Sequence, residues 1–169
     1  MSENYKSFAV ANYILDKLDK YNIKDVTNLK LQKLLYFAYS INLVLYDEKL
    51  FTSQIHAYKL GPVVPDVYRE FKNHGNGVIT TRAYYDIDCG EVGIVKYSDL
   101  TDNDIKSIDI ACSAQGNTKA WDLVDITHRK NSAWTKVYKH DQKHIEIPDN
   151  YIKEEFEQYI DTLAAYLLK

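Results

Sequence analysis

One apolar run, between residues 27 and 46, constrains the fold of this chain more than any other feature. Within it, apolar residues recur every three or four positions, the spacing of one helix face, at Leu31, Leu34, Leu35, Ala38, Ile41 and Leu45. Further apolar residues, Tyr36, Phe37 and Leu43, fall outside that stripe. A helix that is apolar around most of its circumference needs neighbours on several sides. The run therefore predicts a central helix over about 27–46, capped by Thr27.

The neighbours of this helix are predicted from further periodic segments. Expected helices cover about 7–21 (capped by Ser7), a short segment from Pro65 towards 75–77, a segment after the capping-box sequence 101–104, one from 117, a short one at 132–138, and a last one at about 150–168 capped by Asp149 or Asn150. This last helix is expected to pack on the rest. The whole chain, 1–169, then reads as one mainly α, compact domain.

The predicted β structure is small. An extended segment is expected within 51–60, stopped by Gly61-Pro62, and another β-rich stretch at 78–81. A hairpin is expected between 84–88 and 92–97 with its turn at 90–93, and a short strand at 145–147. These segments predict a small β-hairpin or short antiparallel sheet beside the helices.

Composition excludes several classes of protein. The net charge is −3, with a mild basic excess in the first half and an acidic excess in the second, so direct nucleic-acid binding is not expected. The two cysteines, Cys89 and Cys112, are too few for a disulfide framework or zinc site and are expected to be reduced. No segment has the length of a membrane span or the pattern of a signal peptide, so we expect a cytoplasmic protein without membrane contact.

The search for catalytic and metal-binding motifs is largely negative. No nucleophile elbow, phosphate-binding loop, dinucleotide fingerprint or zinc-protease motif occurs. His140 and His144 are four residues apart, but the surrounding sequence favours a polar loop over a metal site. Asp125 and His128 leave open a hydrolase, provided that they converge in an open cleft with a third polar group. The alternative is that His128 braces the end of its helix.

The segment 58–68 stands out because two prolines and a glycine lie between flanking tyrosines. Such a stiff loop is either a docking surface or only the turn that starts a helix. The chain also has 15 tyrosines. Six of them, Tyr5, Tyr13, Tyr21, Tyr36, Tyr39 and Tyr46, belong to the first two helices, where packing at the core rim explains them. Of the two tryptophans, Trp121 is expected in the core and Trp134 is a candidate anchor.

Read in order, several of these segments resemble the Panacea antitoxin-domain family, which includes SocA-like and phage-associated GepA-like proteins. The resemblance covers about 7–138 and is carried by Leu31-Gln32-Lys33-Leu34-Leu35-Tyr36-Phe37, by Gly61-Pro62-Val63, by Thr127-His128 and by Ala133-Trp134. The sequence departs from the family at Tyr58, where many members have tryptophan nearby, and at Ala133, where proline is usual. Segment 82–98 matches little.

The resemblance implies a bacterial antitoxin without enzymatic activity, cofactor or metal that neutralises a cognate protein toxin by direct binding. An alternative is an adaptor that delivers the toxin to a ClpXP-type protease. Aromatic anchors often dominate such interfaces. The partner-binding residues expected on this basis are Tyr58, Lys59, Gly61, Pro62, Val63, Tyr68, His128 and Trp134. The loop 61–68 and the segment 128–134 are expected to lie together.

Overall fold

A computed structural model describes residues 5–87 and 91–169, and places helix α2, Asn28–Tyr46, at its centre. The side chain of Thr27 accepts a hydrogen bond from the Lys30 amide, as the cap prediction requires. Every residue from 31 to 44 is buried. The prediction of a central helix with neighbours on several sides is confirmed.

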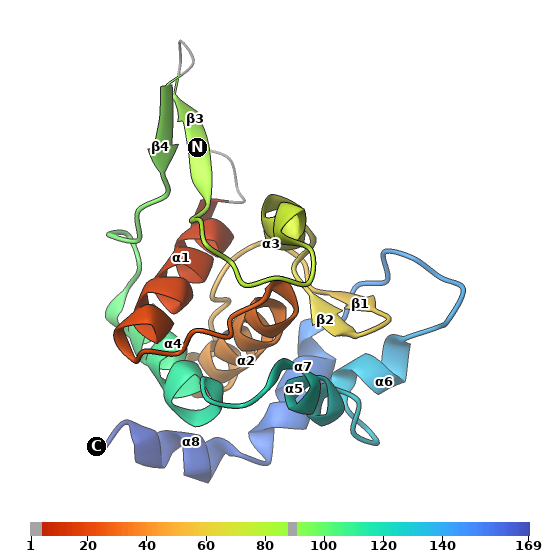
Figure 1. Ribbon diagram of the computed structural model, residues 1–169. Coiled ribbons are helices and arrows are strands. Elements are labelled where there is room, and N and C mark those ends of the chain that lie inside the picture. Colours follow the sequence, from red (N-terminus) through yellow and green to blue (C-terminus); the bar gives the residue numbers. More distant parts are fainter. Residues whose placement is uncertain (1–4, 88–90) are drawn as a thin grey trace.

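In the described part of the chain, six other helices contact α2 (Figure 1). They are α1 (Tyr5–Lys20), α3 (Pro65–Phe71), α4 (Asp102–Gln115), α5 (Ala120–Thr127), α7 (Asp149–Glu157) and α8 (Ile160–Tyr166). The predicted capping box begins α4, with both reciprocal bonds between Thr101 and Asp104 present. Pro65 occupies the first turn of α3 as predicted, and a 3₁₀ turn, η1 (Lys72–His74), follows. The mainly helical class is confirmed.

Two predicted helix starts and the last helix need correction. Ser7 lies inside α1 and does not cap it. The segment from 150 to 168 is two helices, α7 and α8, because Tyr159 leaves the helical region with φ −102° and ψ 4°. Apolar spacing cannot reveal this break, since Ile152, Phe156 and Leu163 face the core on both sides of it. Pro148, not Asp149, occupies the N-cap position of α7.

A two-stranded antiparallel hairpin lies over one end of α2. Strand β1 (His56–Tyr58) pairs with β2 (Gly61–Val63), with Tyr58 opposite Gly61 and His56 opposite Val63. Gly61-Pro62 was expected to stop the strand, but these residues form the second strand. Proline is tolerated here because β2 lies at the edge. On its other side β1 contacts 145–147, where the predicted strand is a single bridge from His56 to Glu146.

A second hairpin projects from the body of the molecule (Figure 1). Strand β3 (Tyr84–Ile87) pairs with β4 (Glu91–Ile94), so the predicted hairpin exists with shorter strands. The turn was expected at 90–93, but Gly93 lies within β4, opposite Tyr85. Residues 88–90, including Cys89, lie outside the described residues. The β-rich stretch at 78–81 forms only a bridge between Val78 and Thr27.

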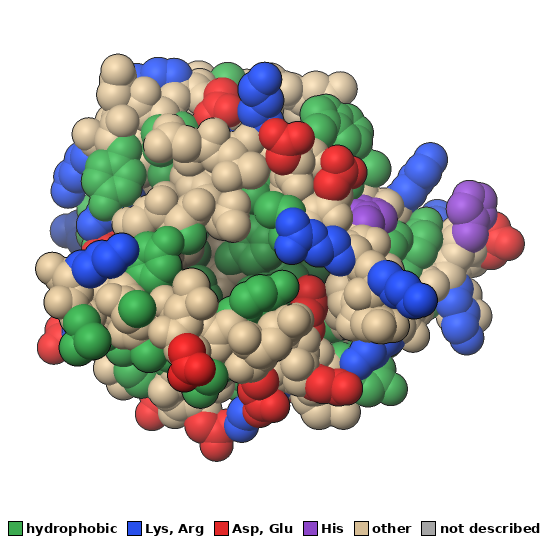
Figure 2. Space-filling model, turned by 90° about the horizontal axis from the view of Figure 1, so that it is seen from below, with side chains coloured by type: hydrophobic (Ala, Val, Ile, Leu, Met, Phe, Trp, Pro, Cys, Tyr) green, Lys and Arg blue, Asp and Glu red, His purple; other side chains and the backbone are tan. Residues whose placement is uncertain are grey.

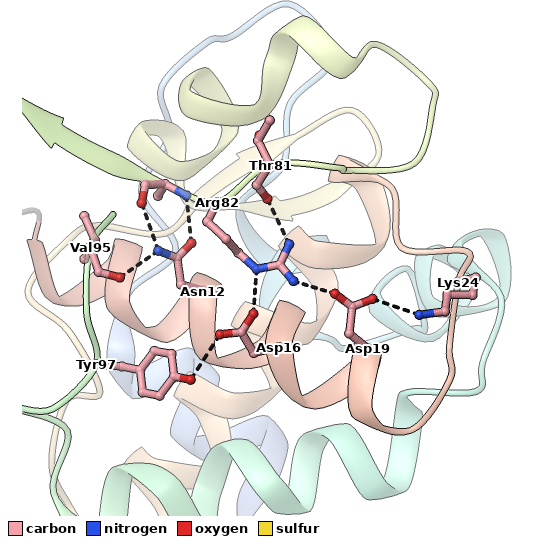
Figure 3. A network of polar contacts seen from close by, with 9 residues as sticks. Asn12, Asp16, Asp19, Lys24, Thr81, Arg82, Val95 and Tyr97 are labelled. Carbon is pink, nitrogen blue, oxygen red and sulfur yellow. Dashed lines mark hydrogen bonds and ion pairs between the residues drawn. The ribbon is translucent and has the colours of Figure 1, made fainter. Parts of the chain in front are cut away.

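A polar network fixes the root of this hairpin to α1 (Figure 3). The buried Asn12 amide donates to the carbonyls of Ala83 and Val95, and its oxygen accepts from the Ala83 amide. The guanidinium of Arg82 contacts both Asp16 and Asp19. The base of the hairpin is therefore held by buried and half-buried hydrogen bonds.

Candidate functional site

Three segments that are far apart in the sequence meet beside the β1–β2 hairpin. They are the hairpin itself, the C-terminal end of α5, and α6 (Ala133–Val137), which Ser132 caps. Direct hydrogen bonds join α6 and the end of α5 to the hairpin. These bonds reach Tyr58 and Lys59, just before the expected segment 61–68, and α5 also contacts β2.

Trp134 belongs to the scaffold of this site. Its indole is only 8% exposed, and Nε1 donates a 2.7 Å hydrogen bond to the carbonyl of Tyr58. The ring stacks on Tyr138, with centroids 4.5 Å apart, and lies 3.7 Å from the ring of His128. A buried indole with its donor satisfied holds the hairpin in place and offers little surface to a partner.

The geometry of His128 agrees with a bracing role. Nδ1 lies 2.7 Å from the Val124 carbonyl and Nε2 lies 3.2 Å from the Lys59 carbonyl. Asp125 is exposed, and its side chain has no hydrogen bond to His128 in the described part of the chain. The convergence in an open cleft that a hydrolase would require is not found at these two residues.

Gly61 lies close to side chains of both α2 and α5. Its φ is +104°, a value that L side chains rarely adopt. A Cβ atom at this position would lie 2.6 Å from Thr127 Oγ1 and 2.9 Å from Lys33 Cε. Both the backbone conformation and the space therefore require glycine.

Lys33 is an unusual member of this contact because its side chain is fully buried. Nζ donates a 3.0 Å hydrogen bond to the Pro62 carbonyl, and no ion pair involves Lys33 among the described residues. Burial lowers the pKa of the Lys33 ammonium from 10.5 to about 7. The Lys33 side chain therefore stabilises the backbone of β2 through this hydrogen bond.

A second polar residue of α2 connects the hairpin to α3. Gln32 Oε1 accepts from the Val64 amide at 2.9 Å, and Gln32 Nε2 donates to Asn28 Oδ1 at 3.0 Å. Asn28 in turn donates to the Tyr68 carbonyl. The polar residues within the apolar run of α2 therefore fix the path of the chain from β2 into α3.

The remaining side chains of this region form a group that we call the hairpin surface: the half-buried Tyr58 and the exposed Lys59, Leu60 and Tyr68. Leu60 is 37% exposed and Tyr68 is 40% exposed, and the Tyr58 and Tyr68 rings lie 5.9 Å apart. Of the residues expected to bind a partner, Gly61, Pro62 and Val63 are buried. Leu60 was missed, although its place between the paired residues Tyr58 and Gly61 marks it as a hairpin tip.

The expectation for the other tryptophan was wrong. Trp121 is 62% exposed, because α5 turns Leu123, Val124 and Thr127 towards the core and Trp121 lies on the opposite face. Trp121 is therefore the exposed tryptophan and Trp134 the buried one.

Metal-ligand clusters were sought throughout residues 5–87 and 91–169. No group of three or more His, Cys, Asp or Glu residues there has the geometry to hold a metal ion. His140 and His144 lie in a non-helical loop, as predicted, and His140 contacts its neighbour Asp141. Cys112 is buried with a free thiol, and burial raises the pKa of this thiol to about 12. Within the same ranges, no helix combines the length and hydropathy needed to cross a bilayer.

Comparison with known proteins identifies the relatives of this chain. Residues 31–135 match the family model described as antitoxin SocA-like, Panacea domain. The chain is also similar to antitoxin SocA of Caulobacter vibrioides (strain NA1000 / CB15N), with 39% identity over 131 residues, which is 76% of this chain and 68% of that protein. No solved structure matches. The matched region contains α2 from residue 31 onwards, both hairpins, and the residues Lys33, Gly61, His128 and Trp134.

Proposed function

This chain belongs to the SocA-like Panacea family of antitoxins, and we propose that it neutralises a cognate protein toxin in the cytoplasm by binding it directly. The observation that carries the proposal is the hairpin surface within the matched region. Three exposed side chains, Lys59, Leu60 and Tyr68, stand there beside the half-buried Tyr58, on a backbone that buried residues hold from below.

The physical argument rests on how firmly the hairpin is held. Bonds from Lys33, His128 and Trp134 reach the carbonyls of Pro62, Lys59 and Tyr58 in turn. A surface fixed in this way loses little conformational entropy on binding, so more of the contact energy appears as affinity. Exposed tyrosines combine a large apolar ring with a hydroxyl and are common anchors of protein interfaces.

The proposed function is non-enzymatic. Both ring nitrogens of His128 lie within hydrogen-bonding distance of backbone carbonyls. The residue that a hydrolase would use as a general base therefore braces the hairpin. Asp125, the other residue of the alternative, is exposed and has no hydrogen bond to His128 among the described residues. The proposal therefore needs no cofactor and no substrate other than the toxin itself.

The test is rescue of growth when the chain is co-expressed with the toxin of the neighbouring gene. Tyr68→Ala removes the more exposed ring of the hairpin surface and should weaken rescue. Tyr21→Ala is the matched control, because Tyr21 is similarly exposed, at 47%, and lies at the end of α1. Both variants should unfold at the same urea concentration as the parent chain, since each removes an exposed ring.

Two outcomes would contradict the proposal. If Tyr68→Ala rescues as well as Tyr21→Ala, the hairpin surface does not bind the toxin. If rescue disappears in cells that lack ClpP, and toxin abundance falls only where ClpP is present, the chain acts as a proteolytic adaptor and not by neutralising its toxin alone.

A further inference from the structure

A groove of about 630 Å³ opens on the face of the molecule opposite the projecting β3–β4 hairpin. It lies between α2, α4, the loop that joins α5 to α6, and the pair α7 and α8. Figure 2 shows this face, with a hollow that has an apolar floor and with Lys and Arg side chains beside it. The residues that line it do not overlap the hairpin surface.

The floor and walls of the groove suit a helix. Phe37 and Ile41, one turn apart on α2, contribute to the lining, and Phe156 and Leu163 contribute from α7 and α8. On the α4 side the lining side chains include Ala111 and Ala114. Small side chains on one wall let another helix approach closely, and a groove between helices is filled by side chains spaced at three and four residues.

The charge of the groove is supplied by two cations. Arg129 and Lys130 line it from the α5–α6 loop, both are exposed, and neither has an ion-pair partner among the described residues. The acidic residue of the lining, Glu155, is committed to the scaffold: its Oε2 accepts from Tyr36 Oη at 2.9 Å and from the Ala133 amide at 2.8 Å. Two cations and one carboxylate therefore line the groove, so the lining carries an excess of one positive charge.

Building on the antitoxin function proposed above, we propose that the groove receives an amphipathic helix of the toxin, with acidic side chains along one border of its apolar face. The apolar side chains of that helix would cover Phe37, Ile41 and Leu163, and its carboxylates would meet Arg129 and Lys130. The α5–α6 segment contributes His128 to the hairpin contact and Arg129 to the groove, so one toxin molecule can reach both surfaces.

Steric blocking tests the apolar part of the proposal. Ala114→Trp places a large ring on the exposed wall of the groove, and Ala165→Trp adds the same ring to an exposed alanine of α8 that does not line it. The Kd for purified toxin should rise at least about tenfold in Ala114→Trp and stay within about twofold in Ala165→Trp.

Charge reversal tests the acidic border. Arg129→Glu with Lys130→Glu should slow association, raise the Kd at least about tenfold and weaken its salt dependence. Lys119→Glu with Lys139→Glu changes the net charge equally at exposed lysines outside the groove and should leave the Kd within about twofold.

Photo-crosslinking identifies the occupant. A photoreactive phenylalanine at position 114 should crosslink to a toxin segment with apolar residues at helical spacing and acidic neighbours, and the same residue at position 165 should not. Crosslinking to an extended or basic segment, or unchanged affinity in Ala114→Trp, would overturn the groove proposal while leaving toxin binding intact. Failure of the unmodified chain to bind or rescue its toxin would instead overturn the proposed function.

Discussion

At the scale of single residues, the fully buried ammonium of Lys33 is an unusual feature of the central helix. The spacing of apolar residues places Lys33 in the central helix, but nothing in that spacing shows that its ammonium is fully buried under β2. The burial depends on a carbonyl 29 residues away. The same holds for Trp121 and Trp134, because a short helix gives too few residues to decide which face is buried.

The burial of Lys33 predicts how stability depends on pH. Its pKa is about 7 in the folded chain and 10.5 in the reference state, so between these values the unfolded chain binds more protons. The free energy of unfolding should therefore rise with pH, by roughly 1 kcal/mol per unit near pH 8. Urea melts between pH 7 and 8.5 measure this slope.

The pH range of this measurement lies below the range in which other groups would lower the free energy of unfolding as pH rises. The pKa values of Cys112 and Tyr13 are both raised to about 12, and their contributions to stability are lost only as pH rises through their unfolded values near 9 and 10. Lys33→Met should flatten the slope, and Lys20→Met, at an exposed lysine, should leave it unchanged. An unchanged slope in Lys33→Met would contradict the assignment.

Gly61 gives a second prediction at this scale. Gly61→Ala should lower the free energy of unfolding by at least about 2 kcal/mol, through the positive φ and through the contact with Thr127. Gly75→Ala separates the two causes, since Gly75 also has a positive φ but has nothing within 4 Å of an added Cβ. Equal destabilisation of the two variants in urea melts would show that crowding at Gly61 does not matter.

At the scale of elements, the starts of α2, α3 and α4, which depend only on neighbouring residues in the sequence, were predicted correctly. The capping box of α4, the Thr27 cap of α2 and the proline that starts α3 each involve residues within one turn. The break between α7 and α8 carries no glycine or proline and was missed. The pairing of Gly61-Pro62 in β2 was also missed, because only the tertiary arrangement shows that this strand is an edge.

The indole of Trp134 is predicted to hold the β1–β2 hairpin through a single bond. Trp134→Phe keeps an aromatic ring but removes the donor to the Tyr58 carbonyl, and should cost about 1–2 kcal/mol of unfolding free energy. Hydrogen exchange of the Ala57 amide, which bonds to Ile145, should become faster. Trp121→Phe should change stability by less than about 0.5 kcal/mol, since that ring is exposed. Similar losses in the two variants would refute the bracing role.

At the scale of the whole molecule, the family motifs describe a scaffold more than a binding surface. Lys33, His128 and Trp134 bond to the hairpin from below, and Gly61 lies in its second strand. The side chains that they support are the half-buried Tyr58 and the exposed Lys59, Leu60 and Tyr68. A sequence pattern cannot separate supporting residues from exposed ones, because both stand in the same short segments. We therefore propose that the exposed residues recognise the toxin and that the matched motifs support them from beneath.

The central claim, direct binding through the hairpin surface, is tested by titrating the purified chain with its purified toxin in a calorimeter, without protease. The account predicts a saturable complex, a Kd at least about tenfold higher for Tyr68→Ala, and a Kd within about twofold of the parent for Tyr21→Ala. Absence of any complex while the chain still rescues cells, or equal Kd values for the two variants, would contradict it.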